Sequence, residues 1–148
     1  MSWAEEDVRL VPVEWLKAHE EIKPKNMEKL LEMTLRWDGF TKPLSADKAT
    51  GTILDGHHRY AVAQRLELAR IPVLCIDYLQ DESVELELWP ASDLESITKQ
   101  DVIDMALSSN LYPPKTTRHR ISDHLPPIHV SLERLSLLTP SQPDANEL

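Results

Sequence analysis

The feature that most constrains the fold of this chain is the pentapeptide Asp55-Gly56-His57-His58-Arg59, which joins a short apolar segment to a segment with helical spacing. A glycine between a strand and a helix allows the backbone to approach a ligand closely, and the first amides of the helix attract an anion. Arg59 can bind two oxygens of a phosphate, and Asp55 can hold a magnesium ion directly or through water. We therefore predict a phosphate site at this junction, the alternative being a capped turn with two surface histidines.

Strand-like and helix-like patterns alternate on both sides of the pentapeptide. Apolar runs and period-two alternation predict strands at 8–13, 43–47, 52–55, 71–78 and 84–89. A chain of 148 residues with 41% hydrophobic content is long enough for one compact domain. We expect a single α+β domain over residues 1–138, with a small mixed sheet and packed helices, followed by a disordered tail over 139–148.

Three helices are expected between and after these strands. The first runs from an N-cap at Asn26 to a C-terminal cap at Gly39. The second opens near His57, so that the pentapeptide ends a strand and begins a helix. The third is introduced by a capping box at Thr98 and ends by Asn110.

The charge and composition disfavour several classes of function. The formal net charge of -9 disfavours nonspecific binding to nucleic acid and to anionic membranes. No apolar run reaches about 18 residues, and the first seven residues lack the regions of a signal peptide, so we expect a cytoplasmic protein. The single cysteine, Cys75, excludes an intramolecular disulfide and lies in an apolar run, where a thiol acts as a small hydrophobe.

Two other groups of polar residues are candidates for chemistry. Glu20 and Glu21 follow the first strand, and either carboxylate could act as a general base, the alternative being solvated loop acids. The loop 113–119 combines a rigid proline entry with hydroxyls, cations and an imidazole, which suits binding of a carboxylate or phosphate, although a plain connecting loop is the alternative. Trp89 could wall a pocket or simply pack at the rim of the core.

Three motifs in this order make the sequence resemble the free L-serine kinases of the ParB/sulfiredoxin-like superfamily. They are Lys17-Ala18-His19-Glu20, Ile53-Leu54-Asp55-Gly56-His57-His58-Arg59 and Pro114-Lys115-Thr116-Thr117-Arg118-His119. The resemblance covers roughly residues 8 to 135 and implies a ParB/sulfiredoxin-like fold. It also implies a phosphotransferase that moves a phosphoryl group from ADP or ATP, with magnesium, to the hydroxyl of free L-serine. The product would be O-phospho-L-serine, a precursor for cysteine synthesis.

The resemblance assigns a role to each candidate residue. Glu20 would be the general base and Asp55 a second catalytic carboxylate and candidate magnesium ligand. Gly56, His57, His58 and Arg59 would surround the phosphates. Trp89, Thr117 and His119 would hold serine, and Arg118 would pair with the serine carboxylate or a phosphate oxygen.

The chain resembles a short form of the family, because only about two dozen residues separate Pro90 from Lys115, where longer archaeal members carry an insertion. A site without that insertion would bind nucleotide weakly, use another donor or close by forming a homo-oligomer. The runner-up is a ParB-like switch that binds CTP, or a DNA-linked regulator without kinase activity. Against it, the sequence after Asn110 is too short for a helix-turn-helix and dimer module, and the charge is wrong for DNA. A sulfiredoxin is disfavoured because residues 55–59 contain no cysteine.

Overall fold

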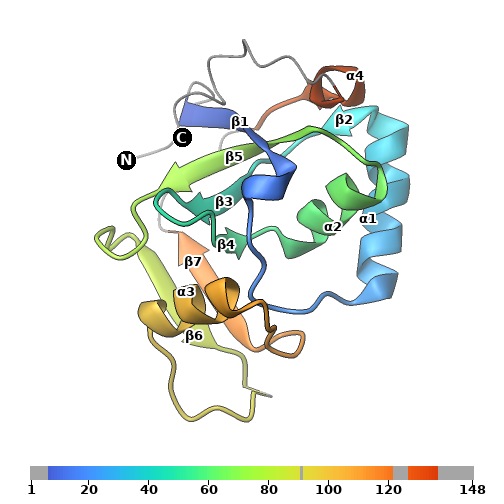
Figure 1. The fold of residues 1–148 in the computed structure, drawn as a ribbon. Helices are drawn as coiled ribbons and strands as arrows, with labels where there is room; N and C mark the ends of the chain where they lie inside the picture. The colour runs from blue at the N-terminus through green and yellow to red at the C-terminus, as the bar shows by residue number, and fades with distance from the viewer. Residues whose placement is uncertain (1–6, 91, 122–126, 137–148) are drawn as a thin grey trace.

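The computed structural model describes residues 7–90, 92–121 and 127–136 and is built around one mixed sheet (Figure 1). The strands of this sheet are β1 (Val8–Pro12), β3 (Leu44–Asp47), β4 (Ile53–Asp55) and β5 (Arg70–Ile76). Their order is β1-β5-β3-β4, with β5 antiparallel to β1 and parallel to β3, and with β3 and β4 antiparallel. The predicted small mixed sheet with packed helices is confirmed.

Strand β5 occupies an inner position of the sheet, as its apolar run predicts. Every residue of β5 except Cys75 is buried, which is typical of a strand covered on both faces. Cys75 is half-buried and packs against the core, and burial raises the pKa of its thiol. The thiol is therefore held neutral, as expected of a small hydrophobe.

Helix α1 (Pro24–Trp37) begins before the predicted N-cap, so the prediction of a cap at Asn26 is wrong. Lys23 is the N-cap and Pro24 is the first helical residue. Proline suits this position because its fixed φ is helical and its missing N–H would have had no partner inside the helix.

The end of α1 also differs from the prediction, because Asp38 rather than Gly39 takes the left-handed cap conformation (φ 54°). Gly39 instead begins β2 (Gly39–Phe40), which pairs with β8 (Val130–Ser131). A Cβ at Gly39 would lie 2.5 Å from the Val130 carbonyl oxygen, so the glycine serves the close approach of β8. The short helix α4 (Leu132–Leu135) follows β8 and packs Leu135 into the core.

Helix α2 (His57–Arg65) follows β4 directly and packs beside α1, so the predicted strand-to-helix junction is confirmed. The turn between β3 and β4 contains Gly51 in a left-handed conformation (φ 78°). The carboxylate of Asp47 holds this turn, accepting hydrogen bonds from the amide and hydroxyl of Thr50. The main core is formed by β1, β3, β5, α1 and α2, with the one-turn helix η2 (Val13–Trp15) at its edge.

A second group of elements closes the other side of β4. Strands β6 (Val84–Leu88) and β7 (Thr117–Ile121) form an antiparallel pair, and α3 (Lys99–Ser108) packs with them around a second core (Figure 1). Thr98 and Asp101 form the predicted capping box at the start of α3. Because β7 starts beside the end of β4, the late motif is brought to the strand-to-helix junction.

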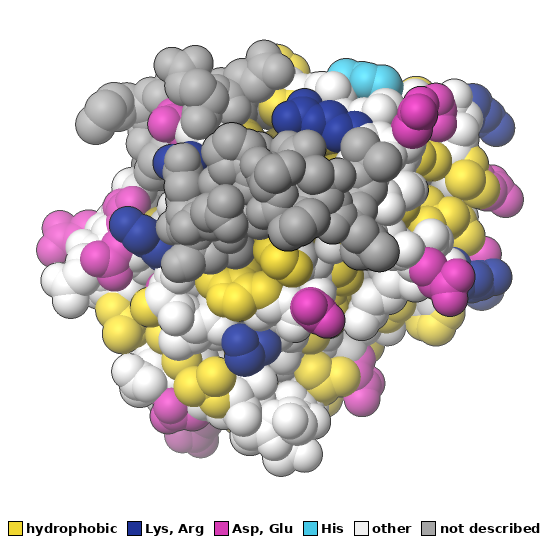
Figure 2. Space-filling view, turned by 45° about the horizontal axis from the view of Figure 1, so that its top comes forward, with side chains coloured by type: hydrophobic (Ala, Val, Ile, Leu, Met, Phe, Trp, Pro, Cys, Tyr) yellow, Lys and Arg dark blue, Asp and Glu magenta, His cyan; other side chains and the backbone are white. Residues whose placement is uncertain are grey.

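The surface does not present a single sign of charge on the face seen in Figure 2. Outside the grey atoms, Lys and Arg side chains lie among Asp, Glu and apolar side chains on this face. No described helix has the length and apolar character needed to cross a membrane. The predicted tail over 139–148 lies outside the described residues.

Candidate active site

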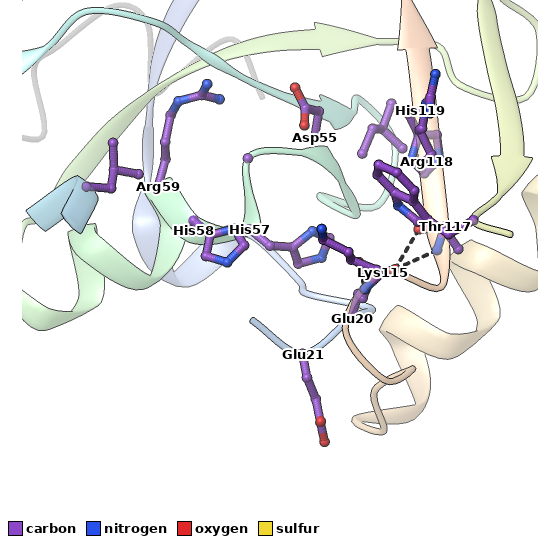
Figure 3. Close-up of a pocket in the computed structure, with 14 residues that line it drawn as sticks. Glu20, Glu21, Asp55, His57, His58, Arg59, Lys115, Thr117, Arg118 and His119 are labelled. Carbon is purple, nitrogen blue, oxygen red and sulfur yellow. Dashed lines mark hydrogen bonds between the residues drawn. The ribbon is translucent and has the colours of Figure 1, made fainter. Parts of the chain in front are cut away.

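One cavity of about 280 Å³ gathers all three motifs (Figure 3). Its walls come from the segment after β1, the β4–α2 junction, the end of β6 and the start of β7. Every residue predicted for the site lines this cavity: Glu20, Asp55, Gly56, His57, His58, Arg59, Trp89, Thr117, Arg118 and His119. Glu21, Leu30, Leu54 and Lys115 complete the lining. The structure thus brings together segments almost 100 residues apart.

The anion-binding end of the cavity is the N-terminus of α2. Gly56 caps the helix with φ 113°, a conformation that other residues rarely adopt. A Cβ at Gly56 would lie 2.6 Å from Cγ of Leu44, so both the backbone and the space require glycine. The first amides of α2 have no acceptor within the helix and are oriented by the helix dipole towards an anion.

The two adjacent histidines are neutral, because each accepts a backbone hydrogen bond through Nε2. Nε2 of His57 accepts from the amide of His19 at 3.2 Å, and Nε2 of His58 accepts from the amide of Lys23 at 3.1 Å. A ring nitrogen that accepts carries no proton, so the remaining proton lies on Nδ1 of each ring. Burial, with the neighbouring imidazoles, holds the pKa of His57 well below its ordinary value, and burial with Arg59 lowers the pKa of His58.

Arg59 and Asp55 are the two charged side chains at this end of the cavity. Burial lowers the pKa of Arg59, an effect that Asp55 opposes. Among the described residues, the guanidinium of Arg59 makes one long hydrogen bond of 3.5 Å, from Nη1 to the Pro43 carbonyl, so its other donors are open to a ligand on this side of the cavity. Asp55 is exposed at the end of β4 and faces the cavity in Figure 3.

At the opposite end of the cavity, Glu20 holds the start of the late motif. Its Oε1 accepts from the amides of Thr116 (3.2 Å) and Thr117 (2.8 Å) and from the Thr117 hydroxyl (2.9 Å). Its Oε2 accepts from the amide of Lys115 (3.2 Å). Lys115 has φ 58°, an uncommon conformation for a non-glycine residue, which the Glu20 contacts help to fix. Glu21 points away from this cluster in Figure 3.

The environment of Glu20 tunes its basicity in two directions. Burial raises the pKa of its carboxyl, and the hydrogen bonds from Thr117, Lys115 and Thr116 lower it. Burial is the larger effect, so the net pKa is above that of a free glutamate. A carboxylate with a raised pKa is a stronger base than one in water.

Trp89 forms a platform for two cations at the cavity wall. The Nζ of Lys115 lies 5.3 Å and the guanidinium of Arg118 lies 5.0 Å from the centre of the Trp89 ring. Glu87 lies 3.7 Å from Nε of Arg118 and 3.3 Å from Nε of Arg120. Trp89 therefore orients positive charge towards the cavity.

Thr117 and His119 direct their polar atoms into the protein. The Thr117 hydroxyl contacts Nε2 of His19 at 2.9 Å, and Nε2 of His119 contacts the hydroxyl of Tyr78 at 2.7 Å. Burial lowers the pKa of His119 to about 3 and that of His19 to about 4, so both rings are neutral. These contacts make Thr117 and His119 part of a buried network behind the cavity wall.

The sequence reasoning missed the roles of His19, Tyr78 and Lys115. The sequence assigns His19 of the early motif no function of its own, and it predicts Tyr78 only as the end of an apolar strand. Lys115 belongs to the late motif, and its unusual φ has no local signature in the sequence. A second cavity of about 190 Å³, which shares Leu30 and Arg59 with the first, was also not foreseen.

These features define a small α+β domain in which a helix N-terminus built to bind an anion faces a partly buried carboxylate. No family model matches the chain. Curated proteins with related sequences do exist. An ATP-dependent L-serine kinase of Staphylothermus marinus is 35% identical over 95 residues, which cover 61% of this chain and 37% of that protein.

Two further relatives carry different names. An ADP-dependent L-serine kinase, SerK, of Thermococcus kodakarensis is 30% identical over 100 residues, which cover 64% of this chain and 41% of that protein. A ParB-like protein of Sulfolobus acidocaldarius is 39% identical over 74 residues, which cover 50% of this chain and 36% of that protein. The chain spans about two fifths of the length of these curated relatives. The resemblance to free L-serine kinases seen in the motifs is confirmed.

Solved structures show the same fold. A glutamate-to-alanine variant of a free serine kinase in complex with ADP superposes with a TM-score of 0.78 at 19% identity, covering 91% of this chain and 100% of that chain. SbnI with a C-terminal truncation, from Staphylococcus aureus, superposes with a TM-score of 0.72 at 16% identity, covering 96% and 92%. The chain therefore has the ParB-like fold that the free serine kinases share, as predicted.

Proposed function

We propose that this protein transfers a phosphoryl group from ADP or ATP to the hydroxyl of free L-serine, giving O-phospho-L-serine. The observation that carries the proposal is that one cavity holds both the anion-binding N-terminus of α2 and the carboxylate of Glu20. Phosphoryl transfer needs the donor phosphates to be fixed and the acceptor hydroxyl to lose its proton. The names of the curated relatives support serine as the acceptor and either nucleotide as the donor.

In this mechanism the donor phosphates lie on the first amides of α2, with Nδ1–H of His57 and His58 and the guanidinium of Arg59 around them. These donors act on phosphate oxygens without giving up a proton, because both imidazoles are neutral. The serine Oγ attacks the terminal phosphorus as the bond from that phosphorus to the bridging oxygen breaks. The leaving group is AMP from ADP, or ADP from ATP.

The serine proton passes to Glu20 in this scheme, and the hydrogen bonds indicate which oxygen receives it. Oε1 already accepts three hydrogen bonds, whereas Oε2 accepts only one, from Lys115. A carboxylate oxygen offers about two lone-pair directions, so Oε2 has a direction left for the acceptor hydroxyl. The raised pKa of Glu20 suits proton removal.

Lys115 and Arg118 are the groups we propose for the carboxylate of free serine. Both lie over the ring of Trp89, which keeps the two cations on one side of the cavity. Arg118 is the stronger candidate because a guanidinium binds a carboxylate through two parallel hydrogen bonds. Thr117 and His119 shape the wall next to serine while their polar atoms hold the buried network.

Magnesium fits this site, with Asp55 as its protein ligand. The structure describes no cluster of three or more His, Cys, Asp or Glu side chains placed to hold a metal ion. Mg²⁺ is commonly held by one or two carboxylates together with substrate phosphates and water, and Asp55 lies at the mouth of the phosphate end. When bound there, the ion would neutralise charge on the phosphates during transfer.

The second cavity is the place we propose for the nucleoside. It adjoins the phosphate end through Arg59 and is lined by apolar side chains of α1 and β2, including Met33, Trp37 and Phe40. A base stacked there would leave the phosphates at α2. Because the nucleoside is common to ADP and ATP, this cavity suits the nucleoside of either donor, although the transferred phosphorus lies one phosphate further from it in ATP.

The proposal is tested by incubating the protein with L-serine, magnesium and either ADP or ATP. We expect O-phosphoserine together with AMP or ADP, in equal amounts. Absence of phosphoserine with both donors, in protein that still binds nucleotide, would refute the kinase proposal.

A ParB-like nucleotide switch is the second candidate, favoured by the name of the Sulfolobus acidocaldarius relative. It predicts CTP binding without phosphoryl transfer, and DNA binding that weakens as salt rises. Titrating the protein with CTP, ADP and ATP, and with duplex DNA at two salt concentrations, separates the two functions. Preference for CTP with salt-sensitive DNA binding would favour the switch.

A further inference from the structure

His19 belongs to the first motif and contacts the other two motifs of the cavity, although its side chain is fully buried. Its amide donates to Nε2 of His57 at 3.2 Å, and its carbonyl accepts from the amide of Tyr112 at 2.8 Å. Its ring lies edge-on to His57 with centroids 4.5 Å apart, and its Nε2 lies 2.9 Å from the Thr117 hydroxyl. The position of His19 thus links the anion-binding helix to the late motif.

The Thr117 hydroxyl connects His19 to Glu20. It lies 2.9 Å from Oε1 of Glu20 and 2.9 Å from Nε2 of His19. A hydroxyl has one proton, and an ionised carboxylate can only accept. With Glu20 ionised, Thr117 therefore donates to Glu20, and the proton between Thr117 and His19 must come from Nε2 of His19. The other ring nitrogen of His19, Nδ1, is buried and makes no hydrogen bond of ordinary geometry in the described part of the chain, although the Ile53 backbone interacts with the ring and raises the pKa of His19.

We propose that His19 is a positioning residue for the catalytic carboxylate. Nε2–H of His19 donates to the Thr117 hydroxyl, so that hydroxyl directs its own proton to Glu20 and holds the carboxylate in place. The inference rests on the proposed role of Glu20 as the base. It assigns a function to the buried histidine before the glutamate. It also explains the inward orientation of Thr117, whose hydroxyl serves Glu20 rather than the substrate.

The surroundings of His19 support a fixed, neutral donor. The titratable side chains that face it are His57, His119 and Tyr112, whose rings lie 4.5, 5.8 and 6.4 Å away between centroids, and Glu20 through Thr117. Burial lowers the pKa of His19 and keeps the ring neutral, an effect that a backbone interaction with Ile53 opposes. A neutral ring with its proton on Nε2 is the form that orients Thr117.

The test uses pairs of substitutions that differ in whether the donor or the hydroxyl remains. His19→Gln keeps an amide donor at about the reach of Nε2, whereas the shorter His19→Asn cannot reach Thr117. Thr117→Ser keeps the hydroxyl, whereas Thr117→Val removes it and preserves the side-chain shape. Thr52→Val is the matched control, because Thr52 is also buried and its hydroxyl bonds to Thr50 in the β3–β4 turn, away from His19 and Glu20.

The first measurement is independent of turnover. The carboxyl ¹³C resonance of Glu20 is titrated in each variant without substrates. Losing a donor to an ionised carboxylate raises its pKa, so we expect a rise of about one unit in Thr117→Val and a smaller rise in His19→Asn. His19→Gln, Thr117→Ser and Thr52→Val are expected to titrate like the wild type. The double variant His19→Asn/Thr117→Val is expected to match Thr117→Val alone, because both changes break one chain of contacts.

The second measurement is the rate of phosphoserine formation. A misplaced base lowers kcat by roughly 10- to 100-fold, and we expect such a loss in His19→Asn and Thr117→Val with the KM for nucleotide unchanged. The conservative variants His19→Gln and Thr117→Ser should lose less kcat than His19→Asn and Thr117→Val, and the control Thr52→Val should keep the wild-type rate. Additive effects of His19→Asn and Thr117→Val, or a Glu20 titration that His19→Asn leaves unchanged, would overturn the inference. If the protein is not a serine kinase, no phosphoserine forms in any variant, but the Glu20 titrations still follow the pattern predicted above.

Discussion

Replacing Glu20 with Gln separates its two roles, accepting the serine proton and holding the late motif. The amide cannot take the proton, so we expect kcat to fall by roughly 10²- to 10⁴-fold. The structure predicts a second effect. The amide oxygen can replace Oε1 and keep the bonds from Thr116 and Thr117, but the amide nitrogen then faces the Lys115 amide, and two donors cannot bond.

The second effect has a magnitude that follows from the hydrogen bonds. Losing the bond from Lys115 and replacing a charged acceptor by a neutral one costs about 1–3 kcal/mol of stability. For a chain of 148 residues each kcal/mol lowers the melting temperature by about 2–4 °C. Nucleotide affinity should not change, because the phosphates are proposed to bind at α2, at the other end of the cavity.

The assays are phosphoserine formation at saturating substrates, thermal unfolding and calorimetric titration with nucleotide. Glu21→Gln is the matched control, since Glu21 is adjacent but points away from the cluster (Figure 3). It should leave all three measurements near those of the wild type. A Glu20→Gln protein whose kcat lies within about 10-fold of the wild type would refute the assignment of the base.

Three further changes probe the phosphate end and the buried imidazoles. Gly56→Ala places a Cβ against Leu44 on a backbone with φ 113°, so it should lower the free energy of unfolding in urea by about 2–4 kcal/mol and weaken nucleotide binding. Unchanged stability would contradict this geometry. Arg59→Lys should weaken nucleotide binding by roughly 10-fold or more in calorimetry, because a lysine cannot bind two phosphate oxygens in one plane; equal affinity would remove Arg59 from the site. Acidification from pH 7 to pH 5 should lower the free energy of unfolding by about 2 kcal/mol for each of His19 and His119. In the unfolded chain both rings take up a proton near pH 6.5, whereas in the folded protein His19 does so only at about pH 4 and His119 only at about pH 3. A stability that does not change with pH would contradict the burial of these rings.

The parts of the fold that were predictable are those set by neighbours in the sequence. The capping box at Thr98 and the glycine between β4 and α2 depend on residues within a few positions of each other, and both are observed. The caps of α1 were mispredicted because two suitable residues competed at each end. Pro24 extended the helix before Asn26, and Gly39 was needed for the approach of β8 rather than for the cap.

The parts of the site that were not predictable are set by side chains far apart in the sequence. His19 and Thr117 are 98 positions apart, and Tyr78 and His119 are 41 positions apart. From the sequence alone, the side chains of Thr117 and His119 could bond either to a ligand in the cavity or to groups inside the protein. Their spacing puts them on the same face of a strand but does not say which residues pack against that face. Their inward hydrogen bonds appear only once β7 is placed beside β4.

The short span between Pro90 and Lys115 suggested a site that lacks part of its nucleotide cover, but in the structure the described residues of this span do not line either cavity. Within the described part of the chain, neither cavity has a lining residue between Pro90 and Pro114. That span instead supplies α3, which packs on the second core, and the Tyr112 backbone that pairs with the segment carrying Glu20. Additional residues in this span would therefore be expected to add cover over the cavity rather than a missing wall. Under the proposed kinase function, we therefore expect any deficit of this chain to appear as weaker retention of the nucleotide, measured as a faster dissociation rate, with the chemical step preserved.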